Sequence, residues 1–239
     1  MAKSLQARFI LPVAAFVILV VLGGAAAFST MESHRVTEDV RTEASHLVDA
    51  TLDTLALTHA LVGEQTHGAM RLLLERGHAI GPASLGPIVK VKERSVPDLL
   101  LGGKPQANLF DLVDGVAGVA GGTATLFVRS SDAFVRVSTN VKRDGERAIG
   151  TVLDPKGRAI AALQHGNAFY GMVDILGNPF LSGYEPIQDV HGQVIGAWYV
   201  GYKLDMAALR DRVAGTRLLD SGFVAVVDRA GKVLSLIHI

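Results

Sequence analysis

The 239-residue chain carries 23 Lys and Arg residues against 23 Asp and Glu residues, so its formal net charge is zero. A chain without a net field does not recruit nucleic acid or an acidic polymer through its overall charge. The absence of cysteine excludes a disulfide framework, thiolate catalysis and cysteine-based metal sites. The length suits one large domain or two smaller ones.

An apolar segment near the N-terminus predicts a membrane anchor. Residues 9–28 contain no charged side chain, and a helix of this length, at about 1.5 Å per residue, spans the roughly 30 Å hydrocarbon core of a bilayer. Basic residues precede this segment and acidic residues dominate the flank after it, so residues 1–8 are expected in the cytoplasm. The alternative is a signal peptide cleaved at the small residues 25–27. In both interpretations the residues that follow this segment are exported from the cytoplasm.

A helical stalk is predicted after this segment. Residues 30–77 lack proline, and apolar side chains recur at intervals of three and four, which is typical of an amphipathic helix. The stripe consists of Val36, Val40, Ala44, Leu47, Thr51 and Leu55. It can pair with a second subunit in a homodimer or pack on its own domain, and the sequence leaves both open.

Residues 81–122 are expected to be irregular. Four prolines and two glycine pairs interrupt this stretch, and both residue types break regular structure. One short helix is predicted at residues 108–119, with Asn108 as its N-cap.

Five strands are predicted in the following block, because short apolar runs alternate there with turn signals. Their ranges are 124–129, 133–140, 169–176, 179–188 and 194–203. A short turn joins the first two strands. A polar connection and a short helix at 158–164, ended by Gly166, lead to a three-stranded meander. This order predicts an α+β fold with a PAS-like five-stranded antiparallel sheet.

The C-terminal residues return to helical spacing at 205–219 and then to a hairpin from residue 223. A hairpin is not a stable domain by itself. The chain is therefore expected to be an N-terminal fragment that stops within a second PAS-like lobe, and whether residues 235–239 are native is left open.

Four segments of the sheet block resemble the Cache superfamily of extracellular sensors: TATLFVRSSDAFVRVSTNV, RAIGTVLD, GNAFYG and YEPIQDVHGQVIGAWYVG. The most similar type is the fused Cache type 3 and Cache type 2 domain of bacterial chemoreceptors and related sensors. The likeness covers residues 96–203 and extends weakly to FVAVVDRAGKVL. It implies a periplasmic sensor between two membrane spans that feeds a cytoplasmic output module. This sequence departs from that pattern, since it carries no second span and no output module.

Side-chain alternation along the strands suggests ligand contacts. Arg136 and Ser138 are expected to share one face of their strand, while Val135 and Val137 on the other face pack on the core. A guanidinium offers a planar fork that matches a carboxylate. The alternatives are a structural ion pair between Arg136 and Asp132 or Glu185, or exposure of Arg136 to solvent.

The other candidate contacts are Tyr170, Asp174, Tyr184, Tyr199 and Lys203. Tyrosines can line a pocket and offer a hydroxyl to a carboxylate, or they can be packed core residues. Asp174 can bind the ammonium of an amino acid or neutralise Arg136. Trp198 is expected in the core.

No metal, cofactor or catalysis is predicted. His59 and His67 lie eight residues apart and lack the His-x3-His spacing of a zinc helix. Ser138 and Ser182 lack the motif of a nucleophile elbow. The chain is therefore not expected to be an enzyme.

Together with these observations, the resemblance to Cache sensors implies the periplasmic ligand-sensing region of a transmembrane signal-transduction protein in the bacterial inner membrane, of the methyl-accepting chemotaxis type. The expected partners are a small organic acid or amino acid, the membrane and a second copy of the chain. The alternatives are a secreted periplasmic binding protein, or the sensor of a diguanylate cyclase or histidine kinase. The predicted regions are a cytoplasmic N-terminus (1–8), a transmembrane helix (9–28), a helical stalk with packing helices (30–92), the sensor lobe (93–204), and a linker helix with the truncated second lobe (205–239).

Overall fold

The computed structural model describes residues 42, 45–46, 48–50, 52–54, 56–204, 225–227 and 233–236. The chain divides into two units, Ala56–Met206 and a second unit made of Met1–Leu55 with Ala207–Ile239. Within the latter, β11 (Ala225–Val227) and β12 (Val233–Leu236) form the predicted antiparallel hairpin. The predicted membrane span, the six residues of the stalk stripe and the linker helix lie outside the described residues. Among the described helices, none has the length and apolarity needed to cross a bilayer.

The larger unit is built on a five-stranded antiparallel sheet with the order β5-β4-β10-β9-β8. Its strands are β4 (Thr123–Ser130), β5 (Ala133–Thr139), β8 (Phe169–Ile175), β9 (Asn178–Gln188) and β10 (Val194–Lys203). The crossover from β5 to β8 carries α3 (Arg158–Gln164). Gly166 follows α3 with a φ of 74°, the left-handed conformation that ends many helices. The predicted PAS-like arrangement is therefore confirmed.

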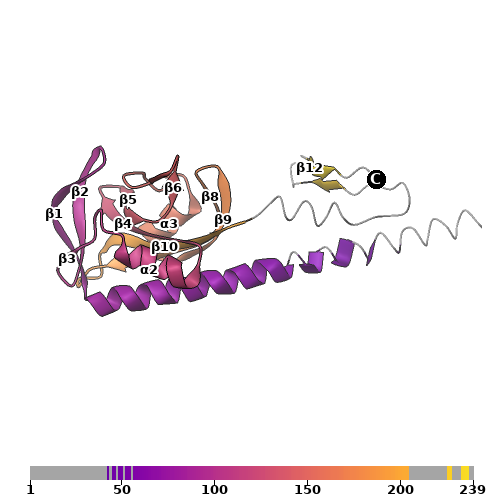
Figure 1. The fold of residues 1–239 in the computed structure, drawn as a ribbon, viewed down its shortest axis with the longest axis horizontal. Coiled ribbons are helices and arrows are strands. Elements are labelled where there is room, and N and C mark those ends of the chain that lie inside the picture. The colour runs from indigo at the N-terminus through magenta and orange to yellow at the C-terminus, as the bar shows by residue number, and fades with distance from the viewer. Residues whose placement is uncertain are drawn as a thin grey trace, which may run out of the picture. The chain divides into compact units, whose positions relative to one another are not determined.

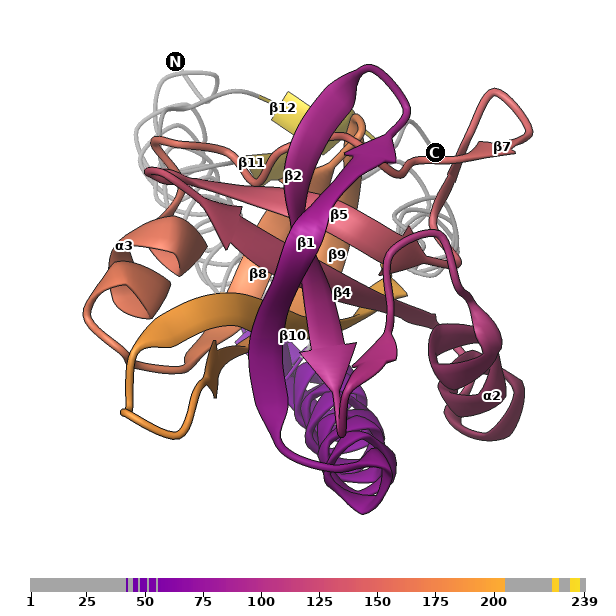
Figure 2. The same ribbon diagram turned by 90° about the vertical axis from the view of Figure 1, so that its left-hand side faces the viewer.

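A long helix, residues 56–80, lies along one face of the sheet together with α2 (Asp111–Ala120) (Figure 1). Figure 2 looks along this helix and shows α3 on the other side of the sheet. We call the two sides the helix face and the α3 face. The core of the helix face joins residues of the helix, α2 and the sheet, among them Met70, Leu73, Val113, Val116, Leu126 and Trp198. The core of the α3 face includes Phe127, Phe134, Ile160, Leu163, Tyr184 and Tyr199.

The long helix approaches the sheet closely at Gly77. A Cβ atom at this position would meet the ring of Trp198, at only 2.7 Å from Cζ3. Trp198 is 2% exposed, so its predicted place in the core is confirmed. Glycine is needed at residue 77 because the helix backbone lies directly against the indole ring and leaves no room for a Cβ atom.

Residues 81–122 are not irregular, contrary to the prediction. β1 (Ala83–Val91), β2 (Arg94–Leu101) and β3 (Lys104–Pro105) form a separate three-stranded antiparallel sheet. Pro87 lies at a register shift of β1, between Leu85 and Ile88. Proline is tolerated in strands at such irregular positions, since no ladder hydrogen bond is required there.

The predicted helix in this stretch exists, but it begins later and with a different cap. α2 starts at Asp111, and its N-cap residue is Phe110. Asn108 instead has a φ of 60°, and its side-chain amide donates to the carbonyl of Lys90 at 3.1 Å. The asparagine therefore holds the β1–β2 hairpin near α2 and does not cap the helix.

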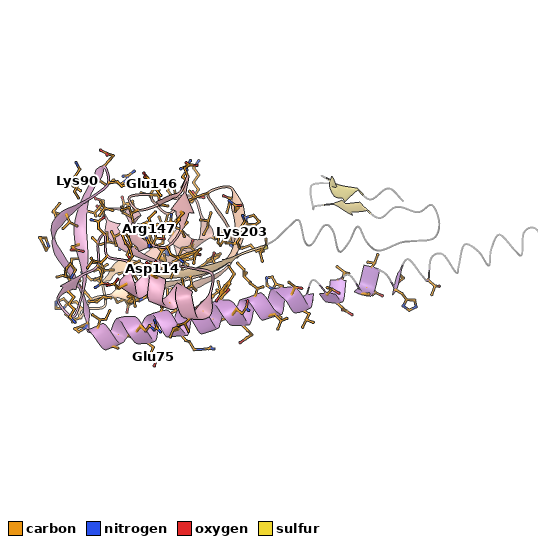
Figure 3. All side chains as sticks on the ribbon, viewed as in Figure 1. Glu75, Lys90, Asp114, Glu146, Arg147 and Lys203 are labelled. Atoms are coloured by element: carbon orange, nitrogen blue, oxygen red, sulfur yellow. The ribbon has the colours of Figure 1, made fainter. Side chains whose placement is uncertain are left out.

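The polar connection after β5 has its own structure. β6 (Lys142–Arg143) and β7 (Glu146–Arg147) form a small hairpin. Both terminal nitrogens of Arg147 bind the carboxylate of Asp114 on α2, each at 2.7 Å (Figure 3). Residues 148–153 then run beside β5 and donate and accept backbone hydrogen bonds at Phe134 and Arg136. This segment covers the outer edge of the sheet.

Candidate functional site

A β-bulge in β5 decides which of its side chains face α3. Leu126 of β4 pairs with Ser138, but the next residue, Phe127, pairs with Arg136. Val137 is therefore an extra residue, and an insertion of this kind shifts the alternation of the side chains that follow. Arg136 lies on the α3 face, with its guanidinium carbon 5.2 Å from the centroid of the Phe127 ring.

Ser138 lies on the opposite side of the sheet. It pairs with Leu126, which belongs to the core of the helix face. Its hydroxyl donates to the carbonyl of Leu109, just before α2. The expectation that Ser138 shares a face with Arg136 is therefore wrong, because strict alternation does not hold across a bulge.

A cavity of about 420 Å³ lies on the α3 face. Its walls come from β5, from the segment between residues 151 and 159, and from β8 and β9. Side chains that line it include Arg136, Thr151, Leu153, Phe169, Val173 and Tyr184. A few polar groups set among apolar walls are the usual composition of a small-molecule site.

Arg136 is a buried cation within this cavity. The residue is 6% exposed, and its Nη1 donates to Oγ1 of Thr151 at 2.8 Å. Its Nε has no hydrogen-bond partner among the described residues. Burial lowers the pKa of Arg136, yet a guanidinium stays protonated in proteins. The side chain therefore brings a positive charge without a counter-charge to the cavity wall.

No carboxylate of the described residues forms an ion pair with Arg136. The predicted alternatives, Asp132 and Glu185, do not contact it; Glu185 instead accepts a hydrogen bond from Tyr170. A buried charge normally has a partner of opposite sign. The missing counter-charge is the most informative feature of the site.

Aromatic rings form the floor beneath Arg136. The ring centroids of Tyr184 and Tyr199 are 4.8 Å apart, and Tyr199 shares a hydrogen bond with Thr123 at 3.1 Å. Burial raises the pKa of both phenols, so both remain neutral near pH 7 and can donate hydrogen bonds. Tyr184 lines the cavity, whereas Tyr199 lies below it and is fully buried.

Asp174 reaches the cavity only at its mouth. The residue is exposed, and its Oδ1 accepts a hydrogen bond from the backbone of Gly177 at 2.8 Å. This contact stabilises the turn between β8 and β9.

Two other predicted residues lie away from the cavity. Tyr170 is on the helix face, where its ring stacks on His67 with the centroids 4.0 Å apart. Its hydroxyl donates to Oε1 of Glu185 at 2.7 Å. Lys203 is exposed at the end of β10 (Figure 3) and does not line the cavity. The structure therefore brings Arg136 and Tyr184 together and separates Tyr170 and Lys203 from them.

Thr151, Lys156 and Arg158 also line the cavity and were not predicted. Thr151 and Lys156 come from the connection between β5 and α3, and Arg158 is the first residue of α3. The guanidinium of Arg158 lies 5.5 Å from the centroid of the Phe169 ring. Two basic residues at the start of a predicted helix were the available signal, but their place beside Arg136 depends on backbone pairing with β5. Among the described residues, no group of three or more metal-ligating side chains is present.

Residues 30–237 match the protein family described as Cache 3/Cache 2 fusion domain. The ligand-binding domain of the Campylobacter jejuni chemoreceptor Tlp3 in complex with L-valine is a similar solved structure, with 13% identity, a TM-score of 0.44, and coverage of 84% of this chain and 71% of that chain. The sensory domain of Campylobacter jejuni Tlp3 (CcmL) gives 12% identity, a TM-score of 0.44, and coverage of 83% and 72%. No curated protein matches the chain.

Proposed function

Because the chain belongs to the Cache 3/Cache 2 fusion domain family, we propose that it is the periplasmic ligand-sensing region of a transmembrane chemotaxis receptor. The apolar residues 9–28 and the charge asymmetry around them support an inner-membrane anchor. The ligand is a small carboxylate that binds in the cavity on the α3 face.

The buried, unpaired guanidinium of Arg136 carries this proposal. A charge removed from water without a partner is strongly unfavourable, and a bound carboxylate supplies the missing partner. The guanidinium of Arg136 lines the cavity, and hydrogen bonds between ionised groups are stronger than neutral ones. The hydroxyl of Tyr184 provides a second donor at the cavity wall.

The strands that line the cavity also contact the long helix. Tyr184 of β9 faces the cavity, while Tyr170 of β8 stacks on His67 of the helix from the other side of the sheet. A ligand that favours one arrangement of β8 and β9 therefore also favours the position of the long helix that goes with that arrangement.

The long helix is proposed to pair with a second copy of the chain. Leu57 and Leu61 lie one turn apart and are 62% and 58% exposed. Apolar side chains at this spacing form the seam of two paired helices.

Titration calorimetry of the full chain with a panel of organic acids tests the proposal. We expect Arg136→Met to weaken binding of the best ligand at least about tenfold, which corresponds to roughly 1.4 kcal/mol. Arg129→Met is the matched control, because Arg129 lies on the neighbouring strand, donates to the carbonyl of Ser131 and does not line this cavity.

The stability of the ligand-free variant separates loss of binding from loss of folding. Replacement of an unpaired buried charge by a methionine of similar length is expected to leave the unfolding free energy unchanged or raise it by about 1 kcal/mol. Unchanged affinity of Arg136→Met for every ligand of the panel would exclude Arg136 as the anion contact.

A further inference from the structure

The two carboxylates that line the cavity each bind a nearby backbone amide. Asp154 and Asp174 are exposed. Oδ1 of Asp154 accepts from the backbone of Lys156 at 2.9 Å, and Oδ1 of Asp174 accepts from the backbone of Gly177 at 2.8 Å. Each acid therefore stabilises its own turn and not a group deep in the cavity.

Strand alternation also directs Asp174 away from Arg136. Phe169, Val173 and Ile175 of β8 belong to or pack on the core of the α3 face. Tyr170, four residues before Asp174, packs on the opposite core. Residues separated by an even number share a face, so Asp174 projects from the side opposite to Arg136 and meets the cavity at the edge strand.

The charge of the lining is consequently positive. Arg136, Lys156 and Arg158 give three cations against the two carboxylates, a net charge of +1. The inner wall next to Arg136 is formed by hydroxyl groups and by apolar side chains such as Leu153, Phe169 and Val173. The two acids of the lining, Asp154 and Asp174, are exposed, whereas Arg136 is buried.

An α-amino acid bound to Arg136 would place its ammonium in a buried region without a carboxylate partner. Its ammonium is attached to the carbon next to the carboxylate, so binding of that carboxylate to Arg136 draws the ammonium into the same buried region. A buried ammonium without a carboxylate partner is disfavoured by several kcal/mol. A hydrocarbon chain, in contrast, gains from contact with apolar walls.

We infer that the ligand is a short carboxylate without an α-ammonium group. This inference rests on the proposed function and narrows its ligand class. Under this inference Asp174 does not bind the ammonium of an amino acid, which is one of the two roles that the sequence analysis considered for it.

Matched pairs of ligands that differ only in the ammonium test the inference. Titration calorimetry of the full chain compares propionate with L-alanine, and butyrate with L-2-aminobutyrate. We expect the ammonium-free member of each pair to bind at least about tenfold more tightly, since one unpaired charge corresponds to more than roughly 1.4 kcal/mol.

The outcomes distinguish this inference from the proposed function. Equal or tighter binding of the amino acids overturns the inference, while the proposed function survives if Arg136→Met still abolishes their binding. If no member of either pair binds, the inference is overturned. If, in addition, no organic acid of the wider panel binds, the proposed carboxylate site fails with it.

Asp174→Asn provides a second test. Asparagine keeps an Oδ1 acceptor for the backbone of Gly177 but removes the negative charge. We expect the affinity ratio of propionate to L-alanine to change by less than about threefold, because a charge at the exposed mouth is screened. Selective weakening of L-alanine by about tenfold or more would show that Asp174 holds an ammonium, and would overturn the inference.

Discussion

The two faces of the central sheet are packed for different tasks. On the helix face, apolar side chains such as Met70 and Leu73 fill the space to the sheet, and at Gly77 no room is left for a methyl group. The α3 face holds a cavity, the unpaired guanidinium of Arg136 and a buried hydroxyl pair between Thr125 and Thr139 at 2.6 Å. The helix face is therefore packed throughout, whereas the α3 face combines a core with a cavity suited to ligand chemistry.

The largest expected effect compares two buried leucines. Leu73 on the helix face and Leu163 on α3 are both 0% exposed. We expect Leu73→Ala to lower the unfolding free energy by about 2–5 kcal/mol and Leu163→Ala by at least about 1 kcal/mol less, because α3 can relax toward the cavity. Urea unfolding measures both values. An equal or larger loss for Leu163→Ala would contradict the difference between the faces.

The contact between Gly77 and Trp198 gives the next effect. Gly77→Ala must displace helix or indole ring and is expected to lower the unfolding free energy by about 1–3 kcal/mol. Gly63→Ala is the control, since a Cβ atom added there would have no neighbour within 4 Å, and it should stabilise by about 0.5–1 kcal/mol through helix propensity. Trp198 is the only tryptophan, so its fluorescence reports the displacement. Equal stability of the two variants would show that the long helix and the sheet are packed loosely enough to accept an added methyl group.

Alkaline pH probes the aromatic floor of the α3 face. Burial raises the pKa of Tyr184 above its ordinary value of 10.0, so above pH 10 the unfolded chain releases this proton before the folded chain does. The contribution of Tyr184 to the unfolding free energy is therefore constant below this pH and falls above it, by about 1.4 kcal/mol per pH unit.

Unfolding of the wild type and of Tyr184→Phe between about pH 8 and pH 11 measures this slope. The variant is expected to lose one tyrosine's share of the decline, while Tyr199 retains its own. Identical slopes for the two proteins would mean that Tyr184 ionises in the folded protein as readily as in the unfolded one.

The sequence predicted features that depend on neighbouring residues and missed those that depend on distant pairing. The five strands were found because alternation and turn residues are local signals, and Arg136 was found because an arginine inside an apolar strand is conspicuous. The β1–β2 hairpin was missed because Pro87 lies at an irregular position of β1. The extra residue Val137 moved Ser138 to the other face, and no local pattern marks such an insertion.

The segment beside β5 has a consequence for solubility. Thr151, which holds Arg136, belongs to a backbone stretch that pairs with β5 through a hydrogen bond of 2.9 Å from the amide of Arg136 to the carbonyl of Thr151. Without this stretch, β5 would present an open strand edge, and open edges recruit strands of other chains into aggregates. The same loop therefore builds the wall of the cavity and shields the sheet from intermolecular pairing.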